Sequence, residues 1–362
     1  MKILMLAPYS SPIVQRLSKA LEKYSECEVW VASFNVETDL EKKVISLGEI
    51  NSFIDYFKFY KVNKLVKKLN PDIVHAHIIN HYGIMAIFQK KPLIVGLWGS
   101  DVMLAPNKGS FLKREIFKLI NAIVIKRANL MHTSSNHILE ELIKKHGKYI
   151  ENKTNVFYWG FPVEEPSHTN YQLIQAMLNK EYNIEKDNHL IVFPRGLSKV
   201  YDPDNVVKVI KKLLNIKELK IVVLRGFSSE EDVKNFKDKL GAEGDKIIFI
   251  NRLLNTNELY VLYSQTKYHV SIPISDALGG GVIEPFLRGS FPILSNIKPY
   301  KNFVEQNSGF ILEDYSEFSL NNLENKILND QLEVGGLALK NTDYSAQAIV
   351  EKFKKLYEIV LK

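Results

Sequence analysis

Cysteine is almost absent from this chain of 362 residues, because Cys27 is the only one. A single cysteine cannot form an internal disulfide and cannot supply a cysteine-based zinc site, which fits a reducing cytoplasm. No run approaches the ~20 apolar residues that a membrane-spanning helix requires. The apolar part of the N-terminal segment is too short for a signal peptide, so we expect residues 2–7 to form a first strand.

Two phosphate-binding signatures are also missing. No G-x-G-x-x-G follows the first predicted strand, and the chain has no Walker loop, which counts against dinucleotide enzymes and nucleoside-triphosphate enzymes. His75, His77 and His81 are closely spaced, but a strand places only His75 and His77 on one face, without a nearby carboxylate pattern. The sequence therefore predicts no metal site there.

The composition is that of a globular protein, with 46% apolar and 25% charged residues. The chain is too long for one compact core and fits two domains. Its formal charge of +7 is uneven: residues 1–153 carry a net +9, whereas residues 154–362 carry −2. Such a bias indicates an anionic partner, either nucleic acid or an anionic membrane surface, or simply a solvated basic surface.

Buried strands alternate with helices along the whole chain, which is typical of parallel sheets covered on both faces. Three strands of the first half end in polar residues, at His75-Ala76-His77, at Trp98-Gly99-Ser100-Asp101 and at Ser134-Ser135. Ligands of open α/β sheets bind at this carboxyl edge. We place a linker in the polar segment 164–188 and expect an amphipathic helix over residues 346–361.

Two helical segments are rich in lysine. Residues 53–69 interleave aromatic residues and lysines, and the helical period favours a packing helix with a solvated basic face over a nucleic-acid site. Residues 111–127 form an amphipathic helix with basic ends that could contact anionic lipid headgroups. Its wide apolar side favours packing in the core of the first domain.

The most informative stretch is residues 267–295. A buried strand at Tyr268–Ile272 is followed by polar residues, then by Gly279, Gly280 and Gly281, a helix from Val282 and a further strand. A glycine-rich turn that opens a helix can bind a phosphate or diphosphate through backbone N–H groups, although it can also be a plain tight turn. Asp276 and Glu284 flank the glycines eight positions apart. Acids there are better suited to bind sugar hydroxyls than phosphate.

Asp276, seven intervening residues and Glu284, followed by Pro285-Phe286-Leu287-Arg288-Gly289-Ser290-Phe291-Pro292, resemble the acid-x7-Glu motif of retaining GT-B glycosyltransferases of family four. The blocks P-D-I-V-H-A-H, G-L-W-G-S-D-V and K-R-A-N-L-M-H-T-S-S are similar to the N-terminal domain of the bacterial surface-polysaccharide subgroup. This resemblance implies two Rossmann-like, doubly wound α/β domains facing across a cleft. The first would span residues 1–163, with 345–362 crossing back, and the second residues 164–344.

By this resemblance, Glu284 holds the donor ribose, the loop from Gly279 to Val282 holds the diphosphate, and Asp276 lies by the transferred sugar. Arg195 and Lys199, just after a strand at residues 189–193, fit diphosphate binding, since Arg forms bidentate bonds and Lys adds a point charge. Arg252 and Leu253 occupy the loop that seats the nucleobase. Four further residues are expected on the acceptor side: Ser10, Ser11, His77 and Trp98. Asp101 is expected on the acceptor or sugar side.

Three features depart from the family pattern. The first turn, Tyr9-Ser10-Ser11-Pro12, contains no glycine, Trp98 stands where the family has histidine, and Lys199 comes earlier than the usual lysine. These departures motivate an alternative interpretation as a nucleotide-sugar-binding partner subunit without activity. A nucleotide-sugar 2-epimerase shares the fold and is a further alternative, but the acid-x7-Glu motif favours transfer.

We therefore expect a retaining hexosyltransferase that moves a sugar from a nucleotide-diphosphate sugar to a glycan or lipid-linked acceptor in surface polysaccharide or glycoconjugate synthesis. Neither a cofactor nor a metal is expected, because cationic side chains and backbone amides can stabilise the leaving diphosphate. Nucleic acid is not an expected partner. The expected location is the cytoplasm, with the inner face of the membrane as a peripheral site.

Overall fold

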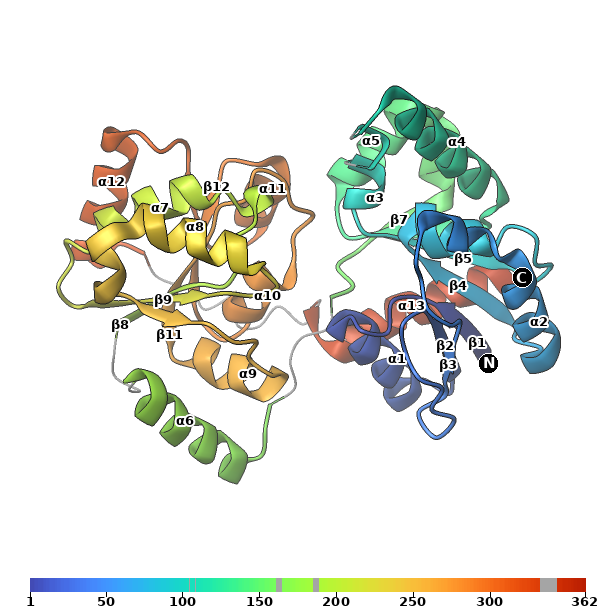
Figure 1. Ribbon diagram of the computed structural model, residues 1–362, viewed down its shortest axis with the longest axis horizontal. Coiled ribbons are helices and arrows are strands. Elements are labelled where there is room, and N and C mark those ends of the chain that lie inside the picture. Colours follow the sequence, from blue (N-terminus) through green and yellow to red (C-terminus); the bar gives the residue numbers. More distant parts are fainter. Residues whose placement is uncertain (104, 108, 161–164, 185–188, 333–343) are drawn as a thin grey trace. The chain divides into compact units, whose positions relative to one another are not determined.

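The computed structural model describes residues 1–103, 105–107, 109–160, 165–184, 189–332 and 344–362. The chain divides into two compact units (Figure 1). The first unit comprises Met1–Phe161 and Thr342–Lys362, and the second comprises Pro162–Asn341.

The first unit is built on a parallel sheet of seven strands in the order β3-β2-β1-β4-β5-β6-β7. Its central strands are almost wholly buried. Helices cover both faces of a parallel sheet, so the side chains on both faces of these strands lie in the core. The strands are β1 (Lys2–Leu6), β2 (Glu28–Ser33), β3 (Val44–Ser46), β4 (Ile73–His77), β5 (Leu93–Leu97), β6 (Leu130–Thr133) and β7 (Thr154–Val156).

The helices of the first unit connect these strands and cover the sheet. They are α1 (Pro12–Tyr24), η1 (Phe53–Phe57), α2 (Phe59–Leu69), η2 (Ile78–Gly83), α3 (Ser100–Met103), η3 (Ala105–Asn107), α4 (Phe111–Arg127), α5 (Asn136–His146), η4 (Lys148–Lys153) and α13 (Ala346–Leu361).

The last helix, α13, packs in the first unit, far from its neighbours in sequence. It contacts α1 and buries Ile349, Phe353 and Tyr357 completely. The Tyr357 hydroxyl is 3.0 Å from Nδ1 of His75 on β4. The C-terminal helix therefore completes the core beneath the middle of this sheet.

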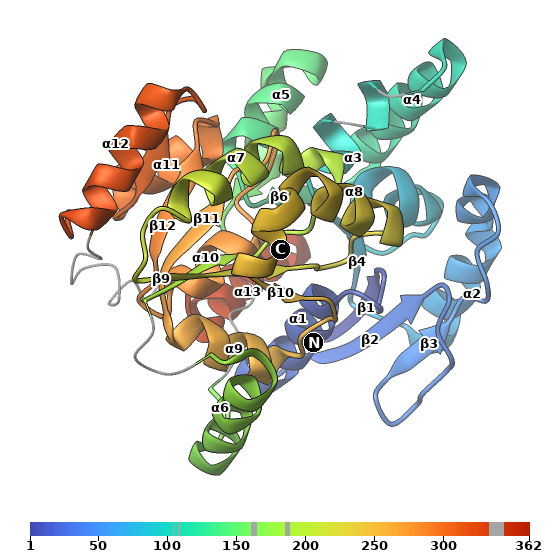
Figure 2. The same cartoon turned by 60° about the vertical axis from the view of Figure 1, so that its left-hand side comes forward.

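The second unit contains a parallel sheet of six strands in the order β10-β9-β8-β11-β12-β13. In both cartoon views α7 and α8 lie on one face of this sheet and α9 on the other (Figure 2). The strands are β8 (His189–Phe193), β9 (Leu219–Leu224), β10 (Ile248–Ile250), β11 (Thr266–Ser271), β12 (Phe291–Ser295) and β13 (Phe310–Leu312). The helices are α6 (His168–Tyr182), η5 (Lys199–Tyr201), α7 (Pro203–Leu213), α8 (Glu230–Leu240), η6 (Gly241–Lys246), α9 (Thr256–Ser264), α10 (Gly280–Phe286), α11 (Lys298–Gln306) and α12 (Glu317–Leu328).

Each sheet has one topological switch point, from which successive strands are added first toward one edge of the sheet and then toward the other. In the first unit this switch lies between β1 and β4, and in the second between β8 and β11. The loops that leave the two central strands run in opposite directions there, so a crevice opens at their carboxyl ends. The predicted fold class, two doubly wound parallel α/β units, is confirmed.

Two local predictions were wrong. The helix predicted over residues 53–69 is broken at Lys58, because buried Asp55 accepts the backbone N–H groups of Asn51 and Ser52 and holds a separate 3-10 turn. The polar segment 164–188, predicted as a linker, contains α6. That helix packs against α9 through half-buried Tyr171 and buried Leu178. These apolar residues therefore face α9.

Candidate functional site

The switch point of the second unit brings together the loops after β8 and β11. Arg195 lies two residues beyond β8, and the loop with Asp276 and the three glycines follows β11. A backbone hydrogen bond of 2.9 Å from Ile274 to Val200 joins the two loops. Residues separated by about eighty positions in the sequence thus form one local site.

The carboxylate of Asp276 is the centre of this site. Its Oδ1 accepts a hydrogen bond of 3.0 Å from Nη2 of Arg195, and its Oδ2 accepts bonds from the Gly279 amide at 3.0 Å and the Tyr300 hydroxyl at 2.8 Å. Burial opposes the charge of Arg195, but Asp276 outweighs it and raises the pKa of the guanidinium. The site therefore holds a fixed ion pair in a largely buried position.

The Arg195 side chain lies against the glycine loop. A Cβ on Gly279 would be 2.5 Å from Nη1 of Arg195, and a Cβ on Gly281 would be 2.6 Å from its Cδ. The guanidinium also stacks over the Tyr201 ring, 4.8 Å from the ring centroid. The glycines are needed here because any side chain would displace Arg195. Among the described residues, its only hydrogen-bond partner is Asp276, so other N–H groups of the fork remain for a ligand.

Of the four predicted diphosphate-binding amides, two are already engaged. The Gly279 N–H donates to Asp276, and the Val282 N–H donates to the Gly279 carbonyl at 3.0 Å. The amides of Gly280 and Gly281 lie in the first turn of α10, where a helix leaves N–H groups without a partner. Within the described residues, these two are the loop amides that a ligand can use.

Glu284 lies one turn into α10 and its side chain points back toward the loop. Its Oε1 is 3.0 Å from the position that a Cβ on Gly280 would occupy. The side chain is half-buried. The acid-x7-Glu spacing thus places Glu284 beside the loop amides, on the same short helix that they open.

Among the described residues, three further predicted residues make no hydrogen bond to Asp276, Arg195 or the glycine loop. Lys199 is exposed at the start of η5. Arg252 bonds to Glu258 at 3.0 Å and to Glu181 at 3.3 Å, so its side chain fixes the loop after β10 to α9 and α6. Leu253 next to it is about half exposed. Arg252 therefore shapes this loop, and its side chain is occupied within the unit.

Sequence reasoning missed Tyr300 on α11. Its ring is completely buried, and its hydroxyl lies 2.9 Å from Oγ of Ser271 as well as bonding to Asp276. Burial, followed by the charge of Asp276, raises the pKa of Tyr300 well above its usual value, so it stays a neutral donor. Nothing in the local sequence around Tyr300 signals this contact, because its partner lies 24 residues earlier.

The predicted acceptor-side residues lie at the carboxyl edge of the first sheet, after β1, β4 and β5. Ser10 is exposed and Ser11 half-buried in the turn between β1 and α1. His77, the last residue of neighbouring β4, is completely buried beneath Trp98, whose Nε1 donates to Nδ1 of His77 at 3.2 Å. The structure thus gives His77 a partner inside the unit, and its contact with a ligand stays a prediction.

Asp101 is buried below the same edge. Its two carboxylate oxygens accept the backbone N–H groups of Ile79 at 2.9 Å and Trp98 at 3.1 Å. Burial raises its pKa to about 6 although these hydrogen bonds oppose the shift. Asp101 therefore fixes the segments that follow β4 and β5, and a direct role on the acceptor or sugar side stays a prediction.

Both switch points carry strained backbone. Ile78 directly follows β4 and has a φ of 65°, and Leu278 precedes the glycine loop with the same φ. Large side chains rarely adopt this left-handed conformation, and it costs on the order of 1–3 kcal/mol at each residue. Such strain clusters at functional sites, which supports these two loops as the ligand-binding edges of their units.

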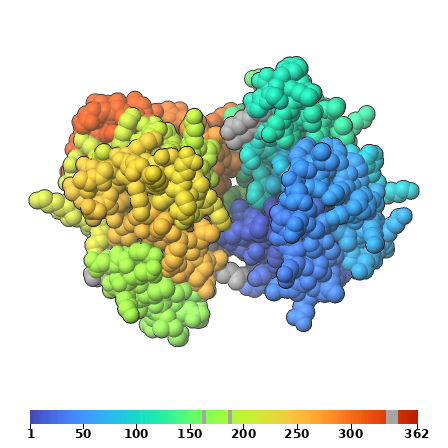
Figure 3. All heavy atoms as spheres, in the orientation of Figure 1, coloured from blue at the N-terminus to red at the C-terminus, as the bar shows by residue number. Residues whose placement is uncertain are grey.

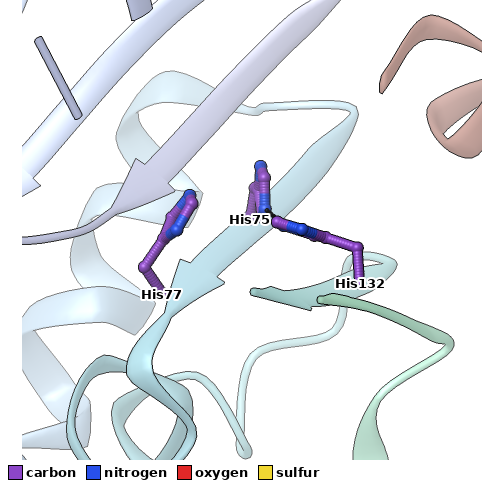
Figure 4. Close-up of side chains that lie close together, drawn as sticks. All are labelled: His75, His77 and His132. Atoms are coloured by element: carbon purple, nitrogen blue, oxygen red, sulfur yellow. Dashed lines mark hydrogen bonds between the residues drawn. The ribbon is translucent and has the colours of Figure 1, made fainter. Parts of the chain in front are cut away.

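Three histidines form a buried cluster under the first switch point (Figure 4). His75, His77 and His132 each offer a ring nitrogen, and these atoms lie within 4.8 Å of one another. Nε2 of His75 and Nε2 of His132 are 2.9 Å apart. Burial lowers the pKa of His77 to about 3 and that of His75 and His132 well below the usual value, so all three are neutral.

These histidines predict acid sensitivity. Between about pH 6 and pH 5 the three rings bind protons only when the first unit unfolds, whereas Asp101 binds a proton in the folded state in this range. His81, whose pKa burial lowers to about 4, also takes up a proton on unfolding, so the net uptake of about three protons should lower the free energy of unfolding by about 4 kcal/mol for each unit by which the pH falls. Urea titrations in metal-free buffer measure this slope. A slope near zero would show that the histidines titrate equally in both states.

Two protein families match different parts of the chain. Residues 2–135 match the family described as Glycosyl transferase 4-like, and residues 175–358 match Glycosyl transferases group 1. No curated protein sequence matches the chain. Among solved structures, it resembles sucrose-phosphate synthase from Thermosynechococcus elongatus, at 14% identity over 99% of both chains with a TM-score of 0.73.

Two more solved structures are similar over nearly their full length. HepE from Anabaena, in complex with UDP and glucose, is 15% identical over 99% of both chains, with a TM-score of 0.73. A glycosyltransferase from Rickettsia africae is 17% identical over 100% of this chain and 98% of that one, with a TM-score of 0.69. With its two parallel sheets of alternating strands and helices, this chain is a GT-B glycosyltransferase and belongs to the family of glycosyl transferases group 1.

Proposed function

We propose that this glycosyltransferase uses a UDP-sugar and transfers the sugar with retention of configuration. The observation that carries the proposal is the Arg195–Asp276 pair, held against the glycine loop at the switch point of the second unit. Similar structures that contain UDP or UDP-glucose support a uridine diphosphate donor. At 15–16% identity these structures show the fold alone, so the choice of uridine as the donor base is part of our proposal.

The diphosphate binds to Arg195, to the amides of Gly280 and Gly281, and to Lys199. The unbonded N–H groups of Arg195 and the first turn of α10 supply positive charge to the leaving phosphate, and so no metal is required there. Lys199 adds a mobile charge at the exposed edge. The ribose hydroxyls bind the Glu284 carboxylate, and the base lies on the loop of Arg252 and Leu253.

Asp276 positions the donor sugar and does not attack it. Its oxygens accept three hydrogen bonds, from Arg195, Gly279 and Tyr300, which lowers the nucleophilicity of the carboxylate. Retention then requires another route. The leaving phosphate oxygen takes the proton of the acceptor hydroxyl as the acceptor attacks the same face of the anomeric carbon. Arg195 stabilises the charge that develops on that oxygen.

Nucleotide binding tests the donor site first. The purified protein should bind UDP more tightly than GDP, ADP or CMP in calorimetry without magnesium, and Glu284→Ala should weaken UDP binding about 10- to 100-fold, as expected for the loss of a charge-assisted hydrogen-bonded contact. Glu218→Ala, an exposed acid of the same unit, serves as the control. Equal UDP affinity in wild type and Glu284→Ala would refute the ribose assignment.

Turnover separates this proposal from its two alternatives. With a UDP-sugar bound, the transferase releases UDP slowly by hydrolysis and faster with an acceptor. A binding partner without activity would hold the donor and release no UDP. A 2-epimerase would instead produce the epimeric UDP-sugar, which NMR of the mixture detects.

Tyr300 provides a prediction about turnover alone. Tyr300→Phe removes the hydroxyl that donates to Asp276 and leaves the buried ring in place. We expect kcat to fall about 10- to 100-fold, since a hydrogen bond to a charged group contributes about 1.5–3 kcal/mol, while the Kd for UDP changes less than about twofold. Tyr315→Phe is the control in the same unit. A loss of UDP affinity equal to the loss of kcat would place Tyr300 in nucleotide binding instead.

For the acceptor, we propose a lipid-linked glycan at an anionic membrane surface. Helix α4 buries Phe117, Ile120 and Val124 but leaves Leu112 and Leu119 more than 60% exposed, so only part of its apolar side packs in the core as predicted. A cavity of about 700 Å³ opens between η1 and α4. In the space-filling view the blue-green atoms of this region form the upper surface of the first unit (Figure 3).

Charge and apolar surface occur together on this helix. Lys113, Arg114 and Lys118 alternate with the exposed apolar side chains. An interfacial helix combines these two features, with apolar groups at the acyl boundary and cations at the headgroups. No helix in the described ranges is long and apolar enough to cross a membrane.

Vesicle binding tests this surface. The protein should sediment with vesicles that contain phosphatidylglycerol and not with pure phosphatidylcholine, and Leu112→Glu with Leu119→Glu should reduce binding at least about tenfold, since each buried leucine contributes about 1.5–3 kcal/mol. Leu173→Glu on α6 has a similarly exposed leucine and should leave binding unchanged. Binding that survives the double change but disappears in high salt would be electrostatic only and would contradict insertion of α4.

A further inference from the structure

The three buried histidines lie in a cross-strand pattern. In the parallel register, His77 on β4 pairs with Gly96 on β5, and Gly96 pairs with His132 on β6. His75 is two residues before His77, so it lies on the same face of the sheet. Gly96 has no side chain between the rings, and a Cβ there would be 2.8 Å from both Nδ1 of His77 and Nε2 of His132. The glycine therefore leaves a space bordered by imidazole nitrogens.

Several polar atoms of the rings around this space have no hydrogen-bond partner among the described residues. Nε2 of His77 and Nε1 of Trp159 are buried and unpartnered, and so is Nδ1 of His132, which lies on the opposite side of its ring from the Nε2 that faces His75. The three histidines are themselves completely buried. Unpaired polar atoms are rare in a dry core because each one loses its bonds to water, so the internal hydrogen bonds of this cluster are incomplete.

We propose that His75, His77 and His132 bind one transition-metal ion of the class that prefers imidazole, such as Zn²⁺. Metal ligation requires the neutral ring, and burial keeps all three rings neutral. The separation of 2.9 Å between Nε2 of His75 and Nε2 of His132 is close to the edge of about 3.3 Å expected for tetrahedral Zn–N bonds. Metal binding would replace the hydrogen bond between these two nitrogens, and the three ligand nitrogens, which lie within 4.8 Å of one another, would close around the ion.

The surroundings of the rings fit such a site. The Tyr357 hydroxyl, at 3.0 Å, orients His75 from behind through Nδ1, as outer hydrogen bonds commonly orient metal-bound imidazole. No carboxylate of the described residues belongs to the cluster, so the proposed fourth ligand is a small anion such as hydroxide or chloride. The Trp159 indole lies with its ring centroid 5.3 Å from His77 and 5.4 Å from His132, and its unpartnered N–H is a donor for that anion.

The role of this ion is structural. It joins β4, β6 and, through Tyr357, helix α13, all of which belong to the first unit. It does not depend on the proposed transfer reaction, whose diphosphate site lies in the second unit and uses no metal. Metal binding should therefore change the stability of the protein and leave UDP affinity unchanged.

Metal titration of the whole chain tests the proposal. Untagged protein stripped with a chelator should bind one Co²⁺ per chain, with the intense visible absorption of tetrahedral coordination, and one equivalent of Zn²⁺ should displace it and raise the thermal unfolding temperature. His132→Phe keeps an aromatic ring beside Phe157 and Phe353 and should weaken Co²⁺ binding at least tenfold. His168→Ala, an exposed histidine of the second unit, should bind as wild type does.

Folding of the variants is checked by circular dichroism, and His77→Gln is the second variant in case His132→Phe does not fold. Absence of saturable Co²⁺ and Zn²⁺ binding to folded wild-type protein would overturn the proposal whatever the variants do. Binding that is equal in wild type and in a folded His132→Phe or His77→Gln variant would also overturn it. UDP binding is measured in the same samples, and its failure would concern only the proposed function.

Discussion

The donor site depends on the contact between Asp276 and Arg195. The carboxylate receives donors from three parts of the second unit: Arg195 after β8, Gly279 in the loop after β11, and Tyr300 on α11. Arg195 and Tyr300 are distant from Asp276 in the sequence, so their bonds to it fix the spacing between segments that the strands alone leave adjustable. Removing either partner would leave a largely buried charge uncompensated, which is far more costly than the net value of the pair. The geometry of the glycine loop is therefore coupled to the charge of Arg195.

The strand order explains why this contact is possible. β8 and β11 are neighbours in the sheet although β9 and β10 come between them in the sequence. Their loops diverge at the carboxyl edge, and the opening between them is filled by the Arg195 side chain against the glycines. The first unit repeats this order at β1 and β4, but its opening contains serines and a buried histidine covered by Trp98. One topology thus carries two edges of different chemistry.

The sequence predicted what depends on local pattern. The spacing of Asp276 and Glu284 around three glycines was enough to place both acids beside the loop, and Arg195 was identified from its position after a strand. Contacts between distant segments were not predictable in this way. Tyr300 has no local signal, and the third histidine of the buried cluster is His132 on β6 and not the nearby His81, because only the register across β5 brings His132 over Gly96. The engagement of the Gly279 amide by Asp276 likewise depends on a side-chain conformation that spacing does not fix.

The uneven charge of the chain fits this division between the two edges. The second part of the sequence carries a slight negative net charge, yet it holds the proposed diphosphate site. Local positive charge from Arg195, Lys199 and the first turn of α10 is sufficient there, because nearby charges in a partly buried site are screened much less than surface charges. The excess of lysine lies in the first unit, whose glycine-free turn at Ser10 and Ser11 offers a poor cradle for phosphate. Its basic residues instead accompany exposed leucines on α4, where a diffuse positive field and apolar side chains act together on an extended anionic surface.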